Sequence, residues 1–278
     1  MKTAIFFRKL APEQIPSLEL LERTLTECGA EMYIFGRDFS SWKDLPEDTG
    51  LFLSLGGDGT FLQSLTFIRD RCIPVAGINF GRLGFLTTAR VEENCREWVS
   101  DLIEGRFTME HRDLLKIQSS AIPEDFYPYA GNEVTLMRNG GGMLTIDVSV
   151  DGRPLPSYWA DGIVIATSTG STAYSLSVGG PIVVPSSKVL ILAPIAPHNL
   201  NVRPLVVPVD SCFEVLFHSR EGKAVLTVDN RTFDVSEGDR FTVSKGEYGF
   251  NYVSLSDNGF INALRTKLLW GEDTRNFK

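Results

Sequence analysis

The sequence contains few cysteines and histidines, and they are not spaced as metal ligands or as a disulfide framework. The four cysteines, Cys28, Cys72, Cys95 and Cys212, lie far apart, and no CxxC pair occurs. The three histidines are also scattered. This pattern argues against a disulfide scaffold and a structural zinc site. A reducing compartment fits it best, so we expect the protein in the cytoplasm.

Long apolar runs and an excess of positive charge are absent too. No stretch approaches the roughly 18 apolar residues of a membrane-spanning helix, and the segment before Arg8 is too short for a signal peptide, so no membrane partner is expected. The chain has 27 basic and 35 acidic residues, a net charge of −8. This balance argues against a duplex DNA-binding surface and hence a nucleic-acid partner, but backbone amides and a metal could still hold a small anion.

Two common phosphate-binding signatures do not occur. No GxGxxG fingerprint follows a predicted strand, and no GK[ST] tripeptide occurs anywhere. A dinucleotide-binding oxidoreductase fingerprint and a P-loop are therefore excluded.

The 278 residues, 43% of them apolar, suffice for one large domain or two closely joined ones. In the first hundred residues, short apolar runs alternate with segments whose apolar residues recur every three or four positions. The predicted strands are 4–7, 32–35, 51–55 and 73–78, and the predicted helices are 15–28, 61–68 and 95–103. We therefore predict an α/β domain over residues 1–105 with a parallel, Rossmann-like sheet.

Beyond Gly105 the pattern becomes β-rich, which predicts a second domain over 106–256. Its predicted strands are 113–120, 132–137, 143–151, 162–167, 188–193, 212–217, 224–229 and 240–255. Hairpins are predicted at Asp151-Gly152 and at Glu237-Gly238-Asp239. The segment 257–278 has apolar residues at steps of four, which predicts a C-terminal helix that could pack back on the first domain.

The glycine-rich segment GGDGT at 56–60 is the first candidate site. It lies between the predicted strand LFLSL and a predicted helix, where α/β proteins bring backbone amides to phosphate. Gly56, Gly57, Gly59 and Thr60 are therefore candidate phosphate-binding residues. A carboxylate such as Asp58 is unfavourable beside phosphate unless it binds a hydroxyl or a metal, which favours a kinase-like site. The alternative is a simple turn with Asp58 as a helix cap.

Two further candidates lie in the β-rich part. Between Pro154 and Pro185 the only charged residue is Asp161, and five hydroxyl residues surround Gly170 in the stretch 167–172. Buried hydroxyls need partners, and a polar ligand would supply them, although a plain Ser/Thr turn is the alternative. The pair Asn132-Glu133 at a strand start is the other candidate, and such a pair alone is more often solvated.

Taken together, these segments resemble the NAD kinase family. The matching segments, in the family's order, are GGDGT (56–60), GINFGRLGFLT (77–87), NE (132–133), DG (161–162), TGSTAYSLSVGGPIV (169–183) and PHNLNVRPLVVP (197–208). The resemblance spans residues 50 to 260. It implies an N-terminal α/β domain, a β-rich C-terminal domain and a homodimer or homotetramer.

The resemblance also implies an activity. ATP would phosphorylate NAD at the 2′-hydroxyl of its adenosine ribose to give NADP, with a divalent cation such as Mg²⁺. A lipid kinase of the diacylglycerol type shares the GGDGT turn, and a non-catalytic NAD(P)-binding regulator could share the fold. The motifs of the second domain favour NAD kinase over the lipid kinase. The presence of Asp58 disfavours the regulator.

Site roles follow from the same resemblance. Asp58 would accept the proton of the ribose hydroxyl, with Gly59 beside it. Asn132 and Glu133 would hold the nicotinamide nucleotide, and Asp161 would bind its polar groups. The implied adenosine pocket is Thr172, Ala173, Tyr174, Ser175, Leu176 and Ser177, and further contact positions are Ala196 and Arg231.

The chain departs from the family pattern at three positions. Ser168 stands where members often have proline, and Trp159 and Gln63 stand where members have basic residues. Phosphate contacts would then pass to Arg82 or to a neighbouring subunit.

Overall fold

The chain folds into two units, and the computed structural model describes residues 1–81, 84–255 and 259–268. Unit 1 contains Met1–His111 and the chain from Phe250 onward, and unit 2 contains Arg112–Gly249. The chain passes between the units inside two continuous strands, β6 (Thr108–Gln118) and β18 (Phe241–Ser254). The crossings therefore lie at 111/112 and 249/250, several residues from the expected domain boundaries at 105/106 and 256/257.

Unit 1 is built on a parallel sheet in the order β2-β1-β3-β4, as the alternating pattern predicted. The strands are β1 (Lys2–Phe6), β2 (Glu31–Ile34), β3 (Leu51–Leu55) and β4 (Val75–Asn79), with the short β5 (Ala89–Arg90) beside β4. Every residue of β3 is buried, because it lies inside the sheet with helices over both faces. Tyr252 of β18 extends the sheet by pairing in parallel with Val75.

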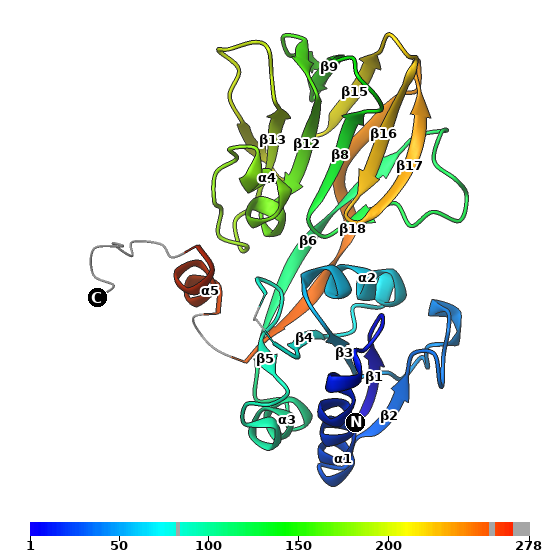
Figure 1. The fold of residues 1–278 in the computed structure, drawn as a ribbon, viewed down its shortest axis with the longest axis vertical. Coiled ribbons are helices and arrows are strands. Elements are labelled where there is room, and N and C mark those ends of the chain that lie inside the picture. Colours follow the sequence, from blue (N-terminus) through cyan, green and yellow to red (C-terminus); the bar gives the residue numbers. More distant parts are fainter. Residues whose placement is uncertain (82–83, 256–258, 269–278) are drawn as a thin grey trace. The chain divides into compact units, whose positions relative to one another are not determined.

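Three helices cover this sheet (Figure 1). Helices α1 (Ile15–Glu27) and α3 (Cys95–Ile103) pack together, and residues such as Leu21 and Trp98 join the strands in one core. Helix α2 (Asp58–Ile68) lies apart from them, and Phe61 on it packs against the rings of Phe250 and Tyr252. Unit 1 is therefore a helix–sheet–helix arrangement, as expected for an α/β fold.

The predicted C-terminal helix is present as α5 (Gly259–Leu268). Its Phe260 ring lies 6.3 Å from that of Phe85, and Lys267 lies over the same ring. The helix therefore contacts the loop after β4. The rest of the predicted segment 257–278, residues 257–258 and 269–278, lies outside the described residues.

Unit 2 consists mainly of antiparallel strands in two sheets. One sheet has the order β14-β13-β12-β8-β16-β17, and the other contains β10-β9-β15-β18 with β11 beside β9. The strands of the first sheet are β8 (Glu133–Arg138), β12 (Gly162–Thr167), β13 (Val189–Ile195), β14 (Leu205–Pro208), β16 (Lys223–Val228) and β17 (Arg231–Ser236). Those of the second include β9 (Leu144–Val150), β10 (Arg153–Pro154), β11 (Tyr158–Ala160) and β15 (Phe213–His218). Strand β6 also pairs with the short β7 (Tyr129–Ala130).

The core of unit 2 combines apolar side chains from both sheets. Leu136 and Ile163 come from the first sheet, and Ile146 and Phe213 come from the second. Strand β12 is buried along its whole length, because a second cluster that includes Val164 covers its other face. The β-rich prediction is therefore confirmed.

One hairpin prediction is confirmed and one is wrong. Asp151-Gly152 turns β9 into β10, and both residues have the positive φ that such a turn requires. The turn Glu237–Asp239 instead links β17 to β18, which belong to different sheets. The hairpin of this region is β16–β17, and its two-residue turn is Asp229-Asn230.

Candidate functional site

The GGDGT turn lies at the carboxyl edge of the parallel sheet, between the positions of β1 and β3. From β1 the chain continues to β2 on one side, whereas β3 and β4 lie on the other side. Such a reversal of strand order opens a crevice at the carboxyl ends, where α/β proteins bind ligands. Gly56 has a φ of +148°, and a Cβ there would lie 2.6 Å from Thr60 Oγ1. The turn therefore requires glycine at this position and leaves its backbone open at the start of α2.

Asp58 is the first residue of α2, and its carboxylate binds the loop that follows β4. Its two oxygens accept hydrogen bonds from the backbone N–H groups of Phe85 and Leu86, each at 3.0 Å. A Cβ at Gly84 would lie 1.7 Å from Asp58 Oδ1, and one at Gly77 would lie 2.1 Å from the Leu86 carbonyl oxygen. The glycines of the GINFGRLGFLT segment are thus what lets this loop approach Asp58. The side chain is partly exposed, so it remains within reach of a ligand.

A cation that the sequence reasoning missed lies beside this turn. Arg8 follows β1, and its Nη2 donates to the carbonyl oxygen of Gly59 at 3.0 Å while its Nε donates to Gln63 Oε1 at 2.5 Å. The turn therefore has an adjacent guanidinium although position 63 is not basic. The only signal in the sequence was an arginine just after a predicted strand. Arg82, the cation proposed from the sequence, lies outside the described residues.

The hydroxyl-rich stretch 167–172 bonds mainly to the protein itself, which corrects one expectation. Thr167 Oγ1 donates to the Gly131 carbonyl oxygen at 2.7 Å, and Ser168 Oγ donates to the Ser187 carbonyl oxygen. Ser171 Oγ both donates to and accepts from the backbone of Val183. These hydroxyls hold the loops together, so their number alone did not indicate a ligand.

The indication of a ligand comes instead from three buried polar atoms at the end of the same sheet. Asn132 Oδ1, Glu133 Oε2 and Ser175 Oγ are buried and have no hydrogen-bond partner among the residues that the structure describes. Asn132 and Glu133 precede and begin β8, and Ser175 belongs to α4 (Tyr174–Ser177). A Cβ at Gly170 would lie 2.2 Å from the Asn132 carbonyl oxygen, and the Tyr174 N–H faces the Glu133 carboxyl group, so the structure brings together the two predicted clusters, Asn132-Glu133 and Thr172–Ser177. Buried polar atoms without partners are unfavourable, and a polar ligand would satisfy them.

A buried charged cluster supports the backbone of this site. Asp229, in the β16–β17 turn, accepts hydrogen bonds from the backbone N–H groups of Gly131, Asn132 and Glu133. Arg231 lies 4.0 Å from Asp229. Burial, with the charge of Asp229 second, raises the pKa of Glu133 to about 8. Sequence reasoning missed Asp229, because an Asp-Asn pair reads as an ordinary turn.

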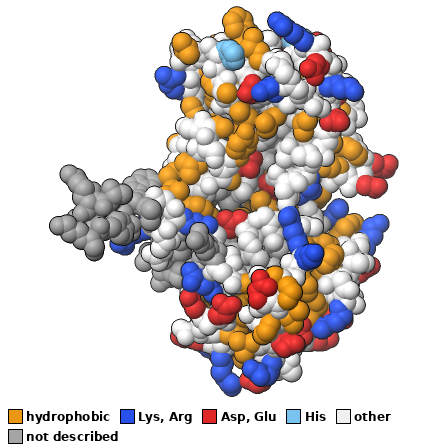
Figure 2. Space-filling model, in the orientation of Figure 1, with side chains coloured by type: hydrophobic (Ala, Val, Ile, Leu, Met, Phe, Trp, Pro, Cys, Tyr) orange, Lys and Arg blue, Asp and Glu red, His pale blue; other side chains and the backbone are white. Residues whose placement is uncertain are grey.

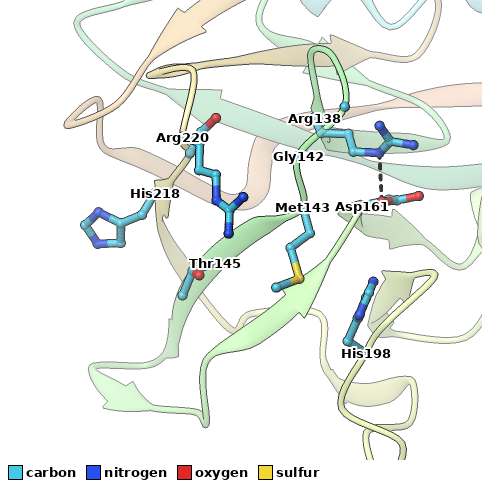
Figure 3. Close-up of a pocket in the computed structure, with 10 residues that line it drawn as sticks. Arg138, Gly142, Met143, Thr145, Asp161, His198, His218 and Arg220 are labelled. Atoms are coloured by element: carbon cyan, nitrogen blue, oxygen red, sulfur yellow. Dashed lines mark ion pairs between the residues drawn. The ribbon is translucent and has the colours of Figure 1, made fainter.

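The remaining predicted residues lie at the other end of β12. Asp161 precedes this strand, and its carboxylate pairs with Arg138 Nε at 2.7 Å beside a cavity of about 630 Å³ (Figure 3). Ala196 follows the neighbouring β13 and has a φ of +46°. At about 3.3 Å per residue, the six-residue β12 separates these residues from Thr167 by roughly 20 Å. Unit 2 therefore carries two clusters rather than one.

The described residues contain no group of three or more His, Cys, Asp or Glu side chains that could hold a metal ion. Within the same residues, no helix is long and apolar enough to cross a membrane. On the face drawn in Figure 2, acidic and basic side chains are interspersed, and no continuous basic surface forms there.

The two units together define a class of protein. In unit 1, the glycine-rich turn of a parallel sheet presents backbone amides and a carboxylate. In unit 2, buried polar atoms lack partners among the described residues. This combination is typical of a nucleotide-binding phosphotransferase.

Comparison with known proteins identifies the family. Residues 43–107 match the ATP-NAD kinase N-terminal domain, and residues 131–255 match the ATP-NAD kinase C-terminal domain. An NAD kinase of Flavobacterium psychrophilum is 42% identical over 241 residues, covering 86% of this chain and 82% of the relative. An NAD kinase of Porphyromonas gingivalis is 37% identical over 292 residues, covering 99% of each chain.

Solved structures agree with this result. Yeast NADH kinase complexed with NADH superposes with a TM-score of 0.86 and 26% identity, covering 100% of this chain and 90% of that one. An NAD kinase from Archaeoglobus fulgidus in complex with ATP gives a TM-score of 0.77 and 28% identity, covering 94% and 96%. The chain therefore belongs to the ATP-NAD kinase family.

Proposed function

We infer that this protein is an ATP-dependent NAD kinase, which transfers the terminal phosphate of ATP to the 2′-hydroxyl of the adenosine ribose of NAD and produces NADP. The observation that carries this conclusion is that one chain matches both kinase domains, over 43–107 and 131–255. The relatives over most of the chain are NAD kinases, which favours this activity over a lipid kinase or a non-catalytic regulator.

In this reaction unit 1 would supply the phosphate-binding turn and the proton acceptor. The backbone of Gly56–Thr60 would receive phosphate oxygens, and Arg8 would add positive charge beside it. As the ribose oxygen forms its bond to the γ-phosphorus, the bond to the β-γ bridging oxygen breaks and ADP leaves. The hydroxyl proton would pass to Asp58. The Phe85 and Leu86 amides fix the orientation of that carboxylate, so it need not reorganise during the reaction.

Unit 2 would supply the nucleotide contacts. The unpartnered atoms of Asn132, Glu133 and Ser175 would bond to polar groups of NAD, and the loop Thr172–Ser177 would line the adenosine pocket. The stretch 167–171 that leads into this loop is held by its own hydroxyls, so the start of the loop would be fixed before the nucleotide binds, which lowers the entropic cost of binding.

A divalent cation, with Mg²⁺ as the favoured ion, would neutralise the triphosphate. Mg²⁺ is commonly held by substrate phosphates and one or two carboxylates, and the partly exposed carboxylate of Asp58 at the glycine-rich turn is a group of that kind. We therefore expect excess chelator to abolish turnover. Activity that persists in chelator would contradict the proposed metal requirement.

We also propose that the protein is a homodimer or homotetramer in the cytoplasm. Asp161 and Ala196 lie at the opposite end of β12 from Asn132 and Glu133, so a second copy could complete the site. Exposed apolar side chains near that end, such as Trp159 at 51% and Leu200 at 87%, would be covered by such a copy. The described cysteines form no disulfide, which fits a reducing compartment. Light scattering of the purified protein tests the oligomeric state.

The test of the function is a coupled assay with ATP, Mg²⁺ and NAD, in which an NADP-specific dehydrogenase detects the product. Diacylglycerol in place of NAD is the control for the lipid-kinase alternative. Formation of NADP, with no phosphorylation of the lipid, is the expected result. Binding of NAD without NADP formation would favour a regulator instead.

A further inference from the structure

Asp229 occupies an unusual position for a carboxylate that belongs to a hairpin turn. It lies between β16 and β17 with a φ of +53°, yet its side chain is only 1% exposed. The carboxylate points inward to the start of β8. Its Oδ2 accepts from the Gly131 N–H at 2.9 Å, and its Oδ1 accepts from the N–H groups of Asn132 at 2.8 Å and Glu133 at 3.3 Å.

These contacts favour the ionised form of Asp229. Both of its oxygens accept N–H groups, and such hydrogen bonds stabilise a carboxylate more than a neutral carboxylic acid. The pKa of Asp229 is nevertheless raised, because its burial outweighs the opposing effects of the Arg231 charge and of the three N–H groups. The guanidinium of Arg231 is itself held over the ring of Tyr127 and donates to the Tyr129 carbonyl oxygen.

Glu133 lacks such support. Its carboxyl group receives the backbone N–H of Tyr174, and its Oε2 is buried without a hydrogen-bond partner within the described part of the chain. The charged group that acts directly on it is Asp229, and Arg231 lies behind Asp229. Two buried carboxyl groups whose negative charges repel each other resist ionising together, so one of them retains a proton to higher pH. The hydrogen-bond geometry places the negative charge on Asp229 and the proton on Glu133.

We propose that Asp229 is a positioning residue for nucleotide binding: it fixes the backbone of Gly131–Glu133 and carries the negative charge of the pair, which leaves Glu133 an uncharged acid that donates a hydrogen bond to the nucleotide. This inference rests on the proposed function, because it assigns the ligand of Glu133 to NAD. It predicts that the recognised group of the nucleotide is a hydrogen-bond acceptor.

A protonated Glu133 makes the binding of NAD depend on pH. Burial and the charge of Asp229 raise the pKa of Glu133 to about 8. Below that pH Glu133 donates, and above it the ionised carboxylate cannot donate and repels the phosphates of NAD. The affinity for NAD therefore falls as pH rises, and Kd grows about tenfold per pH unit well above the pKa if only the protonated form binds.

Two substitutions change this profile in opposite directions. Asp229→Asn removes the neighbouring negative charge, so Glu133 ionises at lower pH and NAD affinity is lost at lower pH than in the wild type. Glu133→Gln keeps an uncharged donor at every pH and leaves the Asp229 contacts to the backbone intact. Its affinity is therefore retained, and its pH dependence disappears. Asp234→Asn is the matched control, because it makes the same change at an exposed position of the same hairpin.

The experiment measures Kd for NAD by titration calorimetry from about pH 6 to about pH 9, an interval that spans the transition of Glu133. Infrared spectra of the NAD-free proteins are recorded beside it, since a protonated carboxyl group has its own C=O stretch. We expect that band in the wild type at neutral pH, its loss in Glu133→Gln, and its loss at lower pH in Asp229→Asn.

The two readouts separate failure of the inference from failure of the function. An infrared band absent from the wild type, or a band whose titration is unchanged in Asp229→Asn, overturns the inference even if NAD binds. The same holds if the wild type and Glu133→Gln share one pH profile. If the band behaves as expected but NAD does not bind at any pH, the assignment of the ligand to Glu133 is wrong together with the proposed function.

Discussion

Replacing Asp58 by asparagine separates the two tasks that the structure gives this carboxylate. It accepts hydrogen bonds from the Phe85 and Leu86 N–H groups, and in the proposed reaction it also accepts the ribose proton. Asparagine keeps one oxygen but turns an NH₂ group toward the other N–H. The variant therefore loses a charge-assisted hydrogen bond and a proton acceptor at once, while NAD binding is retained.

The two losses have different magnitudes. One hydrogen bond to a charged group contributes about 1.5–3 kcal/mol. For a chain of this size that lowers Tm by roughly 3 to 12 °C. Loss of a general base reduces turnover by about 10²- to 10⁴-fold. We therefore expect a modestly destabilised protein that is almost inactive.

The coupled NADP assay measures kcat, calorimetric scanning measures Tm, and titration measures Kd for NAD. Asp70→Asn is the matched control, because it makes the same change at an exposed position of unit 1. A variant at Asp58 with lowered Tm and wild-type kcat would refute the catalytic role and leave only the anchoring of the 84–86 loop.

Other substitutions test the remaining contacts. Gly84→Ala places a Cβ 1.7 Å from Asp58 Oδ1, so both kcat and Tm should fall; an unaffected variant would mean that the loop can move away at no cost. Arg8→Ala should raise KM for ATP more than KM for NAD, and Arg8→Lys should bring KM for ATP part of the way back. Equal effects on both KM values would argue against a phosphate contact. Thr167→Val leaves the Gly131 carbonyl oxygen and the Gly170 N–H unpaired, so denaturant unfolding should show a loss of about 2–4 kcal/mol; a loss near zero would mean that water replaces the hydroxyl.

Much of the fold was predictable because its signals are local. Helical periodicity located α1, α2 and α3, and the change to short β-branched runs after Gly105 indicated the β-rich part. The GGDGT turn was also predictable, because it joins a strand to a helix. Glycine is required at Gly56, where φ is positive and a Cβ would collide with Thr60. The hairpin predicted at Glu237–Asp239 was wrong, because a turn that contains glycine does not show which sheet the next strand joins.

The sequence by itself determined most strands and helices, the two chemical segments GGDGT and TGSTAY, and the family to which they belong, because these depend on residues adjacent in the chain. It did not indicate β11, β14, β17 or α4, which are short or lie within turn-rich stretches. Only the tertiary structure decided which polar groups are already satisfied. It paired the hydroxyls of 167–172 with distant carbonyl groups, brought Asp229 to the amides of a segment almost 100 positions earlier, and placed Arg8 over Gly59. The physical reason is that hydrogen bonding and charge depend on distance in space. The pattern of residues along the chain does not specify that distance.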